Sequence, residues 1–287
     1  METPKISVLM PTYNTQESHL REAIESVLSQ TYTDFEFIIL DDHSQDVDIE
    51  KIVRSYSDER IIFAKNDTNL GISKSRNKLI EMSRGEYLAV MDHDDVSVPN
   101  RFMKQKDFLE HHPNVGVVGG LADIVGTGKL WMSFPKNNIE QGLLIECCIC
   151  HPSAMIRKSV LTDGGVWYDC KYTPSEDYAL WCNLIGKTKF HNIQEVMLHY
   201  RVHRDNVTHR QLNRMKDVML IIQNETRQKF PVLWELAKFN ARKIRRIKLF
   251  SVLPFLKIVE HKKEIKYYLF GRILIMKMII KVSPNLD

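Results

Sequence analysis

The chain has 287 residues, of which 44% are hydrophobic and 26% charged, and its formal net charge at neutral pH is +4. A chain of this length can bury a sizeable core, either as one large α/β domain with a tail or as two smaller domains. It has no apolar stretch long enough to span a membrane, and its opening "METPKISVLMPTYN" lacks the apolar centre of a signal peptide, so we expect a cytoplasmic protein.

The cysteines argue against both a zinc ribbon and a disulfide scaffold. There are five, an odd number, and their spacing lacks the pairs typical of either class. We interpret them as free and mostly buried thiols: Cys147, Cys148, Cys150, Cys170 and Cys182. The run "CCICH" is strand-like, and because alternate residues of a strand face opposite ways, its cysteines cannot converge on one metal ion.

The formal charge is distributed unevenly along the chain. Between Lys238 and Lys281 there are thirteen Lys or Arg residues against two acids, a net +11, which leaves −7 for the remainder. The basic segment also contains apolar runs, so we expect it to lie on an anionic membrane surface, at the inner face of the cell membrane. The alternative is a helical subdomain packed on the main domain. Nucleic acid is discounted as a partner, because no aromatic or glycine-rich RNA-binding motif accompanies the charge.

In chain order, the first third of the sequence alternates strand and helix patterns. Apolar, β-prone runs predict strands, and apolar residues at helical spacing predict the helices between them. The expected elements are a strand at 5–14, a helix at 17–30, a strand at 35–42, a helix at 47–58, a strand at 60–66, a helix at 71–85 and a strand at 86–92. This alternation is typical of a mostly parallel sheet with helices on both faces.

Beyond Pro99 the pattern is less regular. We expect a helix at 101–112, a strand at 115–126, a loop at 132–140, a helix at 175–187, a strand in 190–209 that turns polar, and helices from about 210, interrupted at Pro231 and Pro254. The chain thus divides into a main domain at 1–210, with halves at 1–99 and 100–210, and a helical basic tail at 211–287.

Three of the predicted strands end in polar clusters, at 11–14, 41–42 and 92–95. In parallel sheets, ligands bind beyond the carboxyl ends of the strands, so these clusters should meet along one edge. Gathered carboxylates repel one another unless a cation shares the site. Mg²⁺ or Mn²⁺ would take these oxygen ligands and bind a substrate diphosphate at the same time. The plainer alternative is that strand-end acids cap the next turn or helix.

Seven motifs together resemble one enzyme family. They are "SVLMPTYN", "FEFIILDDHSQD", "NLGISKSRN", "GEYLAVMDHDD", "HPSAMIRKSVL", "SEDYALW" and "YRVHRDNVT", and they cover roughly residues 5 to 210. Their order and spacing resemble those of the family 2 glycosyltransferases, which have the GT-A fold. The resemblance implies a nucleotide-sugar-binding half at 1–99 and an acceptor-binding half at 100–210.

The resemblance also implies roles for individual residues. The nucleotide and diphosphate would be held by Pro11, Thr12, Tyr13, Asp41, Asp42, Arg76, Asp92 and His203. The metal would be held by Asp92, Asp94, Asp95 and His203. Asp177 would be the catalytic base, with Glu176 beside it binding or orienting the acceptor.

The residues themselves support a base at this position. Inverting transfer needs a carboxylate to take the proton of the attacking hydroxyl, and the start of a helix favours an ionised acid. Capping is the structural alternative for Asp177.

His203 and Arg204 offer positive charge or a neutral ligand near a diphosphate, or are ordinary surface residues. Two interpretations, as acceptor-side or core residues, are left open for His151, Trp131, Trp167 and Trp181. His93 lies between two aspartates on a strand, so it should point the other way and affect packing and not catalysis.

These observations together predict an inverting, metal-dependent glycosyltransferase. It would use Mn²⁺ or Mg²⁺ and a UDP-sugar (N-acetylglucosamine, galactose or N-acetylgalactosamine) to extend a glycan or glycolipid of a bacterial surface polysaccharide. The acceptor should contact 131–150 and the tail. Two alternatives are a catalytically silent binding or scaffold protein of the same fold, and a sugar-phosphate nucleotidyltransferase, although "MPTYNTQESH" lacks the glycine-rich loop of the latter.

Overall fold

The structure is a computed structural model, and it describes residues 3–132, 136–203 and 211–240 together with three strands at 256–261, 264–269 and 273–279. The chain separates into two compact units, Met1–Leu233 and Trp234–Asp287. Whether the functional domain ends at 210 stays a prediction, but α9 (Leu212–Lys229) lies within the first unit.

In the described part of the first unit, nine strands form one sheet with the order β3-β2-β1-β4-β8-β6-β9-β5, and β7 pairs with β6. Their bounds are β1 (Ile6–Thr12), β2 (Phe35–Asp41), β3 (Ile61–Lys65), β4 (Tyr87–Val90), β5 (Val96–Ser97), β6 (Val115–Ile124), β7 (Leu130–Met132), β8 (Met155–Arg157) and β9 (Lys189–Tyr200). Strands β1 to β4 are parallel, whereas β8 is antiparallel to both β4 and β6. The parallel half is therefore the first third of the chain, as the sequence predicts.

The strand register brings the polar strand ends to one edge. Thr12 pairs with Asp41, Asp41 pairs with Lys65, and Leu9 pairs with Val90, the last residue of β4. The segments that follow β1, β2 and β4 therefore leave the sheet side by side, which confirms the predicted convergence.

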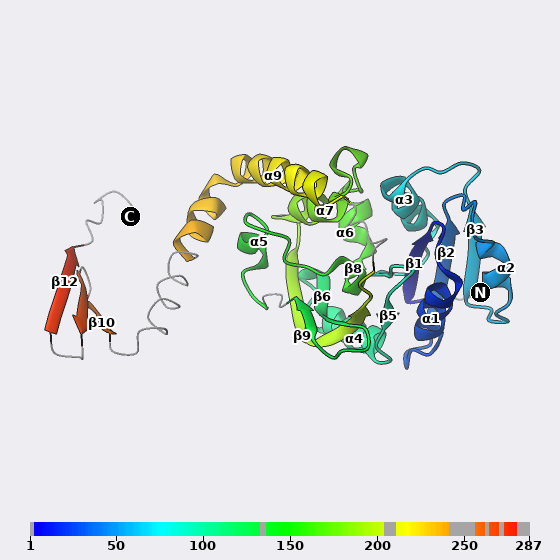
Figure 1. Ribbon diagram of the computed structural model, residues 1–287, viewed down its shortest axis with the longest axis horizontal. Coiled ribbons are helices and arrows are strands. Elements are labelled where there is room, and N and C mark those ends of the chain that lie inside the picture. The colour runs from blue at the N-terminus through cyan, green and yellow to red at the C-terminus, as the bar shows by residue number, and fades with distance from the viewer. Residues whose placement is uncertain are drawn as a thin grey trace. The chain divides into compact units, whose positions relative to one another are not determined.

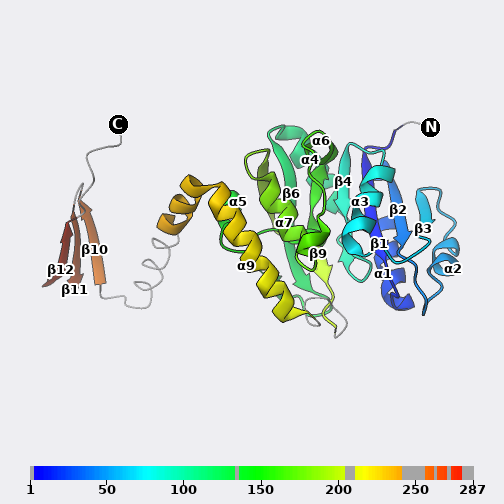
Figure 2. The same ribbon diagram turned by 90° about the horizontal axis from the view of Figure 1, so that it is seen from above.

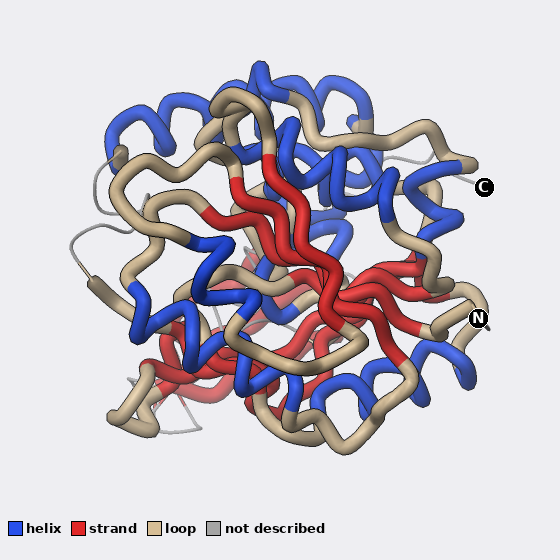
Figure 3. Tube along the Cα trace, turned by 90° about the vertical axis from the view of Figure 1, so that its right-hand side faces the viewer, coloured by secondary structure: helices blue, strands red, loops and turns tan. Residues whose placement is uncertain are grey.

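Helices cover both faces of this sheet (Figures 1 and 3). The helices are α1 (Glu17–Leu28), α2 (Ile49–Arg54), α3 (Ile72–Met82), α4 (Arg101–His111), α5 (Ile139–Gly142), α6 (Lys158–Thr162), α7 (Glu176–Leu184) and α9, with two 3-10 turns, η1 (His151–Ser153) and η2 (Cys170–Tyr172). Alternate residues of β1 show the two faces: Val8 packs with Leu20 of α1 and Phe102 of α4, and Leu9 packs with Leu79 of α3 and Trp181 of α7. Figure 2 looks onto the layer of α3, α7 and α9.

The segment around the cysteines corrects one prediction. Residues 143–150 form turns and loop, not the strand-like run that we expected. Side chains, and not a neighbouring strand, satisfy its carbonyl groups: Arg227 donates to Leu144 O (2.8 Å), Gln223 to Ile145 O (2.7 Å) and Asn192 to Cys148 O (2.8 Å). All five cysteines are free, as predicted; three are buried, but Cys147 is half-buried and Cys170 is exposed.

The second correction concerns the tail. Among the described residues after 210, α9 and the stretch 231–240 are helical. The second unit also contains an antiparallel three-stranded sheet of β10 (Leu256–His261), β11 (Glu264–Leu269) and β12 (Ile273–Ile279). The helical prediction fails there because each apolar run is only six or seven residues long and rich in β-branched or aromatic residues. No helix in the described part of the chain is long and apolar enough to cross a membrane.

Candidate active site

The end of β1 forms one wall of the candidate site. Pro11 and Thr12 are buried, and the Thr12 hydroxyl donates to Leu40 O (3.3 Å), so these two residues fix the backbone. Tyr13 is 46% exposed at the same edge. Asn14, at a positive φ of 47°, receives backbone N–H groups of Gln45 (2.8 Å) and Asp46 (3.1 Å) on its side-chain oxygen. The loops after β1 and β2 are thereby joined, and Tyr13 is the side chain left available to a ligand.

Asp41 and Asp42 are both buried, but their hydrogen bonding differs. Asp42 accepts from the Leu70 N–H (2.8 Å), the Gly71 N–H (2.8 Å) and the Asn66 amide (2.7 Å), so both of its oxygens hold the start of α3. Asp41 accepts from the Ser44 N–H (2.9 Å) on Oδ1. Its Oδ2 lies 3.3 Å from Lys65 Nζ as an ion pair, without making a hydrogen bond to any described residue. Asp41 thus retains the capacity to accept from a ligand hydroxyl.

Arg76 of α3 links the donor side of the site to α7. Its Nη2 lies 3.1 Å from Asp92 Oδ1 and its Nη1 lies 2.7 Å from Glu176 Oε1, and the side chain is only 11% exposed. Although burial opposes the charged form, Asp92 and Glu176 hold the pKa of Arg76 above its ordinary value. One guanidinium group therefore joins two carboxylates that are 84 positions apart in the sequence, as the residue numbers in these pairs show.

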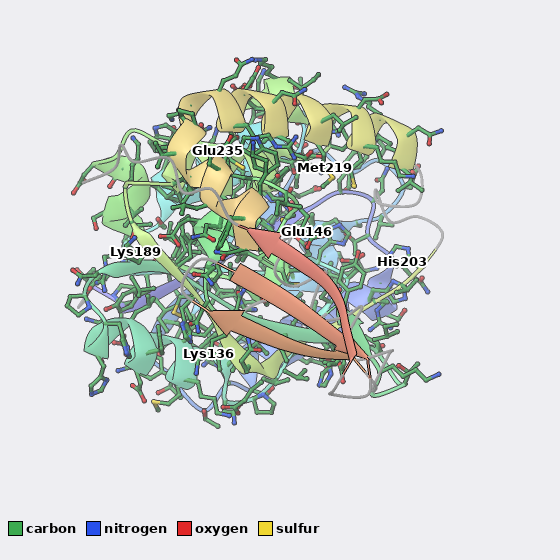
Figure 4. The ribbon with its side chains drawn as sticks, turned by 90° about the vertical axis from the view of Figure 1, so that its left-hand side faces the viewer. Lys136, Glu146, Lys189, His203, Met219 and Glu235 are labelled. Atoms are coloured by element: carbon green, nitrogen blue, oxygen red, sulfur yellow. The ribbon has the colours of Figure 1, made fainter. Side chains whose placement is uncertain are left out.

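The loop after β4 meets the end of β9. Asp94 Oδ2 lies 2.8 Å from His203 Nε2, and Asp95 Oδ1 accepts from the Arg201 N–H (2.9 Å). Arg201 also donates from Nε to Asp94 O (2.8 Å). Figure 4 labels Lys189, the first residue of β9, and, on the other side of the view, His203, which follows the last residue of β9, Tyr200. The acidic loop and the "YRVH" segment are thus in contact, and the role of His203 as a ligand of the metal and diphosphate stays a prediction.

Asp95 is a buried acid in an unfavourable setting. Its Oδ2 has no hydrogen-bond partner among the described residues. Burial, and after it the charges of Asp94 and Asp92, raise the pKa of Asp95 well above its ordinary value.

Glu176 and Asp177 occupy the first two positions of α7. Glu176 is buried, with Oε1 bound to Arg76 and Oε2 without a partner among the described residues. Asp177 is half-buried and accepts from the Tyr178 N–H (2.7 Å). Burial, and then the neighbouring charge of Glu176, raise the pKa of Asp177 to about 6. Asp177 is therefore ionised at neutral pH, yet basic enough to accept a proton.

Comparison with known proteins agrees with this arrangement. Residues 7–165, more than half of the chain, match the sequence profile described as "Glycosyl transferase family 2". The chain belongs to this family. It is therefore a glycosyltransferase, and its sheet and helices are those of the GT-A fold.

Two curated relatives of the enzyme illustrate this membership. An "Uncharacterized glycosyltransferase MJ1057" of Methanocaldococcus jannaschii is 36% identical over 72% of this chain and 74% of its own length. The Escherichia coli "UDP-Glc:alpha-D-GlcNAc-diphosphoundecaprenol beta-1,3-glucosyltransferase WfaP" is 30% identical over 75% of this chain and 82% of its own length.

Solved structures share the fold of this glycosyltransferase. S. aureus TarS 1-349 in complex with UDP-GlcNAc superimposes with a TM-score of 0.63 at 19% identity, over 76% of this chain and 65% of that fragment. The chain spans 39% of the longer TarS structure. The mannosyltransferase PcManGT of Pyrobaculum calidifontis, in complex with GDP-Man and Mn²⁺, superimposes with a TM-score of 0.58 at 15% identity, over 83% of this chain.

The acidic side chains of this glycosyltransferase form only part of a binding site for a divalent cation. Among the described residues, no three or more His, Cys, Asp or Glu side chains are arranged to hold a metal ion. Asp94 and His203 nevertheless offer a carboxylate and an imidazole at one point, and Asp95 Oδ2 is an orphaned buried oxygen. Mn²⁺ and Mg²⁺ accept such a small protein ligand set when substrate phosphates complete their coordination. The residues present therefore fit the predicted ion.

The remaining candidate residues fall into three groups. His151 and Trp181 are buried, with His151 Nε2 2.8 Å from the Tyr168 hydroxyl, so neither is open to an acceptor. Burial, followed by Arg76 and Arg101, lowers the pKa of His151 well below its ordinary value. Trp167 is 37% exposed, and His93 is half-buried with an unpartnered Nδ1 among the described residues. Arg204 and the side chain of Trp131 lie outside the described residues.

The sequence did not single out three residues that the structure places at the site. Arg201 holds Asp94 and Asp95, and Asn66 holds Asp42. His19 of α1 lies with its ring centroid 5.5 Å from that of His203. Arg201 belongs to the quoted motif "YRVHRDNVT", so its position beside His203 was the available signal; His19 and Asn66 had none.

Proposed function

We propose that the protein is an inverting glycosyltransferase that moves a sugar from a UDP-sugar to a glycan or glycolipid acceptor. The observation that carries this proposal is the bridge of Arg76 between Asp92 and Glu176, because it places the acidic loop of the donor side next to the start of α7. A donor bound at the acids and an acceptor bound at α7 would meet there.

In this proposal Asp177 is the catalytic base and Glu176 is not. Glu176 Oε1 already accepts from the Arg76 guanidinium (2.7 Å), so this carboxylate holds Arg76 in place. Asp177, with its pKa raised to about 6, takes the proton of the attacking hydroxyl. Glu176 Oε2, which has no partner among the described residues, is free to accept a hydrogen bond from a sugar hydroxyl.

The donor subsite would combine three groups of residues. Tyr13 stacks on the base, and Asp41 accepts from the nucleoside through Oδ2, which faces Lys65 but makes no hydrogen bond to a described residue. Asp94 and His203, with Asp92 and Asp95, would hold Mn²⁺ or Mg²⁺, which neutralises charge on the leaving diphosphate when bound. The UDP-GlcNAc complex of TarS and the UDP-Glc in the name of WfaP support a uridine nucleotide.

The acceptor in this proposal is a lipid-linked or surface glycan. The name of WfaP includes a diphosphoundecaprenol acceptor, and the net charge of +11 between Lys238 and Lys281 suits an anionic membrane surface. A bacterial surface polysaccharide is the pathway that these two features favour, with the enzyme peripheral on the inner face of the membrane. Replacing Arg242, Lys243, Arg245 and Arg246 by Gln should reduce sedimentation with anionic liposomes at low salt; unchanged sedimentation would remove the membrane from the proposal.

The test of the proposed reaction is nucleotide release. Purified full-length protein is incubated with Mn²⁺, a panel of UDP-, GDP- and CDP-sugars and mixed glycolipid acceptors, with and without EDTA. We expect release of UDP from one donor, abolished by EDTA and restored by Mn²⁺. Release of GDP or CDP would overturn the donor, release insensitive to EDTA would overturn the metal, and no release from any donor would overturn the reaction.

A further inference from the structure

Tyr168 is a buried residue that the proposed reaction does not use directly. It lies between α6 and η2 and is 5% exposed. The Arg76 guanidinium lies over its ring, with 5.5 Å from Cζ to the ring centroid. Its hydroxyl lies 2.8 Å from His151 Nε2, inside the protein. The ring thus has a cation on one face and a fixed polar anchor at its far end.

The backbone of Tyr168 is held by the neighbour of Arg76. The Asn77 side chain accepts from the Tyr168 N–H (2.9 Å) and donates to the Tyr168 carbonyl (2.8 Å). Consecutive residues of α3 therefore contact the same tyrosine, one through its backbone and the other through its ring. This double contact fixes Tyr168 relative to α3 more tightly than packing alone would.

Arg76 needs such support because its own hydrogen bonds leave its guanidinium plane able to tilt. Its two terminal nitrogens bind Asp92 and Glu176, but its buried Nε has no partner among the described residues. Without a partner at Nε, the guanidinium plane could tilt about the line between the two carboxylates. The face of an aromatic ring opposes that tilt, since it attracts the flat cation.

We propose that Tyr168 is a positioning residue that holds the Arg76 guanidinium between Asp92 and Glu176. Through Arg76 it fixes the acidic loop of the donor side relative to the start of α7, where Asp177 lies. This inference rests on the proposed function for its kinetic consequence, but the Tyr168–Arg76 contact can be measured without any activity.

The first measurement is a double-mutant cycle on stability. Urea unfolding is followed for the wild type, Tyr168→Leu, Arg76→Lys and the double variant. We expect the two substitutions to be non-additive, because each removes the same contact of a planar cation with a ring. Additive effects would overturn the proposal, whether or not the protein is found to transfer a sugar.

The second measurement is the steady-state rate of sugar transfer, with the donor that the nucleotide-release assay identifies. Tyr168→Leu should lower kcat by about tenfold or more while changing the KM for the donor little, since the displaced group acts between the two substrates. Tyr168→Phe, which keeps the ring and loses only the hydroxyl, should restore most of the wild-type rate. A loss in Tyr168→Phe as large as that in Tyr168→Leu would overturn the role of the ring face.

A matched control separates positioning from loss of a buried ring. Tyr87 is also buried, with Arg157 over its ring at 5.2 Å, but it begins β4 at the edge away from the acids. Tyr87→Leu should lower stability comparably and leave kcat within about twofold of the wild type. If Tyr87→Leu lowers kcat as much as Tyr168→Leu, the proposal is wrong. Should Tyr168→Leu not fold, Tyr168→Met takes its place in both measurements, because its longer, unbranched side chain adapts to an irregular space and has no π face.

Discussion

Asp42 and Asp95 are both buried aspartates that follow strands of the same sheet, yet they differ in how many hydrogen bonds their carboxylates accept. Asp42, after β2, accepts three hydrogen bonds, two of them from backbone N–H groups at the start of α3. Asp95, after β4, accepts one from the Arg201 N–H, and its second oxygen has no partner among the described residues. The saturated carboxylate holds the polypeptide in place, and the unsaturated one keeps its capacity for a ligand.

The same difference separates the two regions around these residues. Near β2, the loop side chains of Asn14 and Ser44 are bonded to backbone or to each other's loops. Near β4 and α7, Asp95, Arg76 and Glu176 each have a buried atom without a hydrogen bond among the described residues, whereas near β2 the corresponding oxygen of Asp41 still faces Lys65 Nζ at 3.3 Å. Buried polar atoms without partners are rare in folded proteins and are costly to maintain. Their concentration at one place marks the region where substrate should complete the hydrogen bonding.

The largest expected effect comes from the unsaturated region. Asp177→Asn removes the proposed proton acceptor and leaves the shape of the side chain nearly unchanged, so kcat should fall by roughly 10²- to 10⁴-fold. Donor binding, measured by calorimetry with UDP and Mn²⁺, should change little. Asp163→Asn is the matched control, because Asp163 is an exposed acid at the end of α6. A variant Asp177→Asn with near wild-type kcat would show that the base lies elsewhere.

The second effect is the dependence of transfer on pH. Burial and the charge of Glu176 raise the pKa of Asp177 to about 6, and only the ionised form can accept a proton. The rate should therefore be full above pH 7 and fall about tenfold for each pH unit below 6. The measurement is kcat/KM between pH 5 and pH 8 at saturating Mn²⁺. A kcat/KM that stays nearly constant down to pH 5, as expected for an aspartate with its ordinary pKa, would contradict the raised pKa and weaken the contrast between the regions.

Much of this could be predicted from the sequence, because the fold is encoded by periodicity. Alternating strands and helices predicted the parallel half of the sheet, and the register of Thr12 with Asp41 follows from it. The family motifs also contain Arg76, Asp92 and Glu176, three candidate residues that the structure joins by ion pairs. Features of the fold that depend on local sequence patterns can therefore be predicted from the sequence.

The part of the site that could not be predicted is the hydrogen bonding of its polar groups, because it depends on tertiary packing. No pattern distinguishes Asp42 from Asp41, although Asp42 accepts three hydrogen bonds near the start of α3 and Asp41 accepts one and pairs with Lys65. The clamp of Asn77 on the backbone of Tyr168 joins residues that are 91 positions apart. The strands of the second unit were missed for a different reason, because short apolar runs such as 264–269 fit a helix or a strand equally well.

The third effect tests the saturated region. In Asp42→Asn an amide group must replace one carboxylate oxygen, so at least one backbone N–H at Leu70 or Gly71 loses its acceptor and faces another donor. We expect a loss of about 1–3 kcal/mol in the free energy of unfolding. Thermal unfolding should show it as a decrease of about 2–4 °C for each kcal/mol in a unit of this size. A stability equal to that of the wild type would mean that Asp42 is not the structural member of the pair.

The smallest effect, of opposite sign, is expected for Asp95→Asn. Because burial and the charges of Asp94 and Asp92 raise the pKa of Asp95, the folded protein disfavours the ionised carboxylate relative to the unfolded chain. The contribution of Asp95 to stability is thus complete below pH 4 and declines as the pH rises above that value. Its neutral amide replacement should be as stable as the wild type at pH 4 and slightly more stable at pH 7. Thermal unfolding at the two pH values, without added metal, measures this difference. A variant that is less stable than the wild type at pH 7 would place Asp95 with Asp42 among the residues that hold the fold.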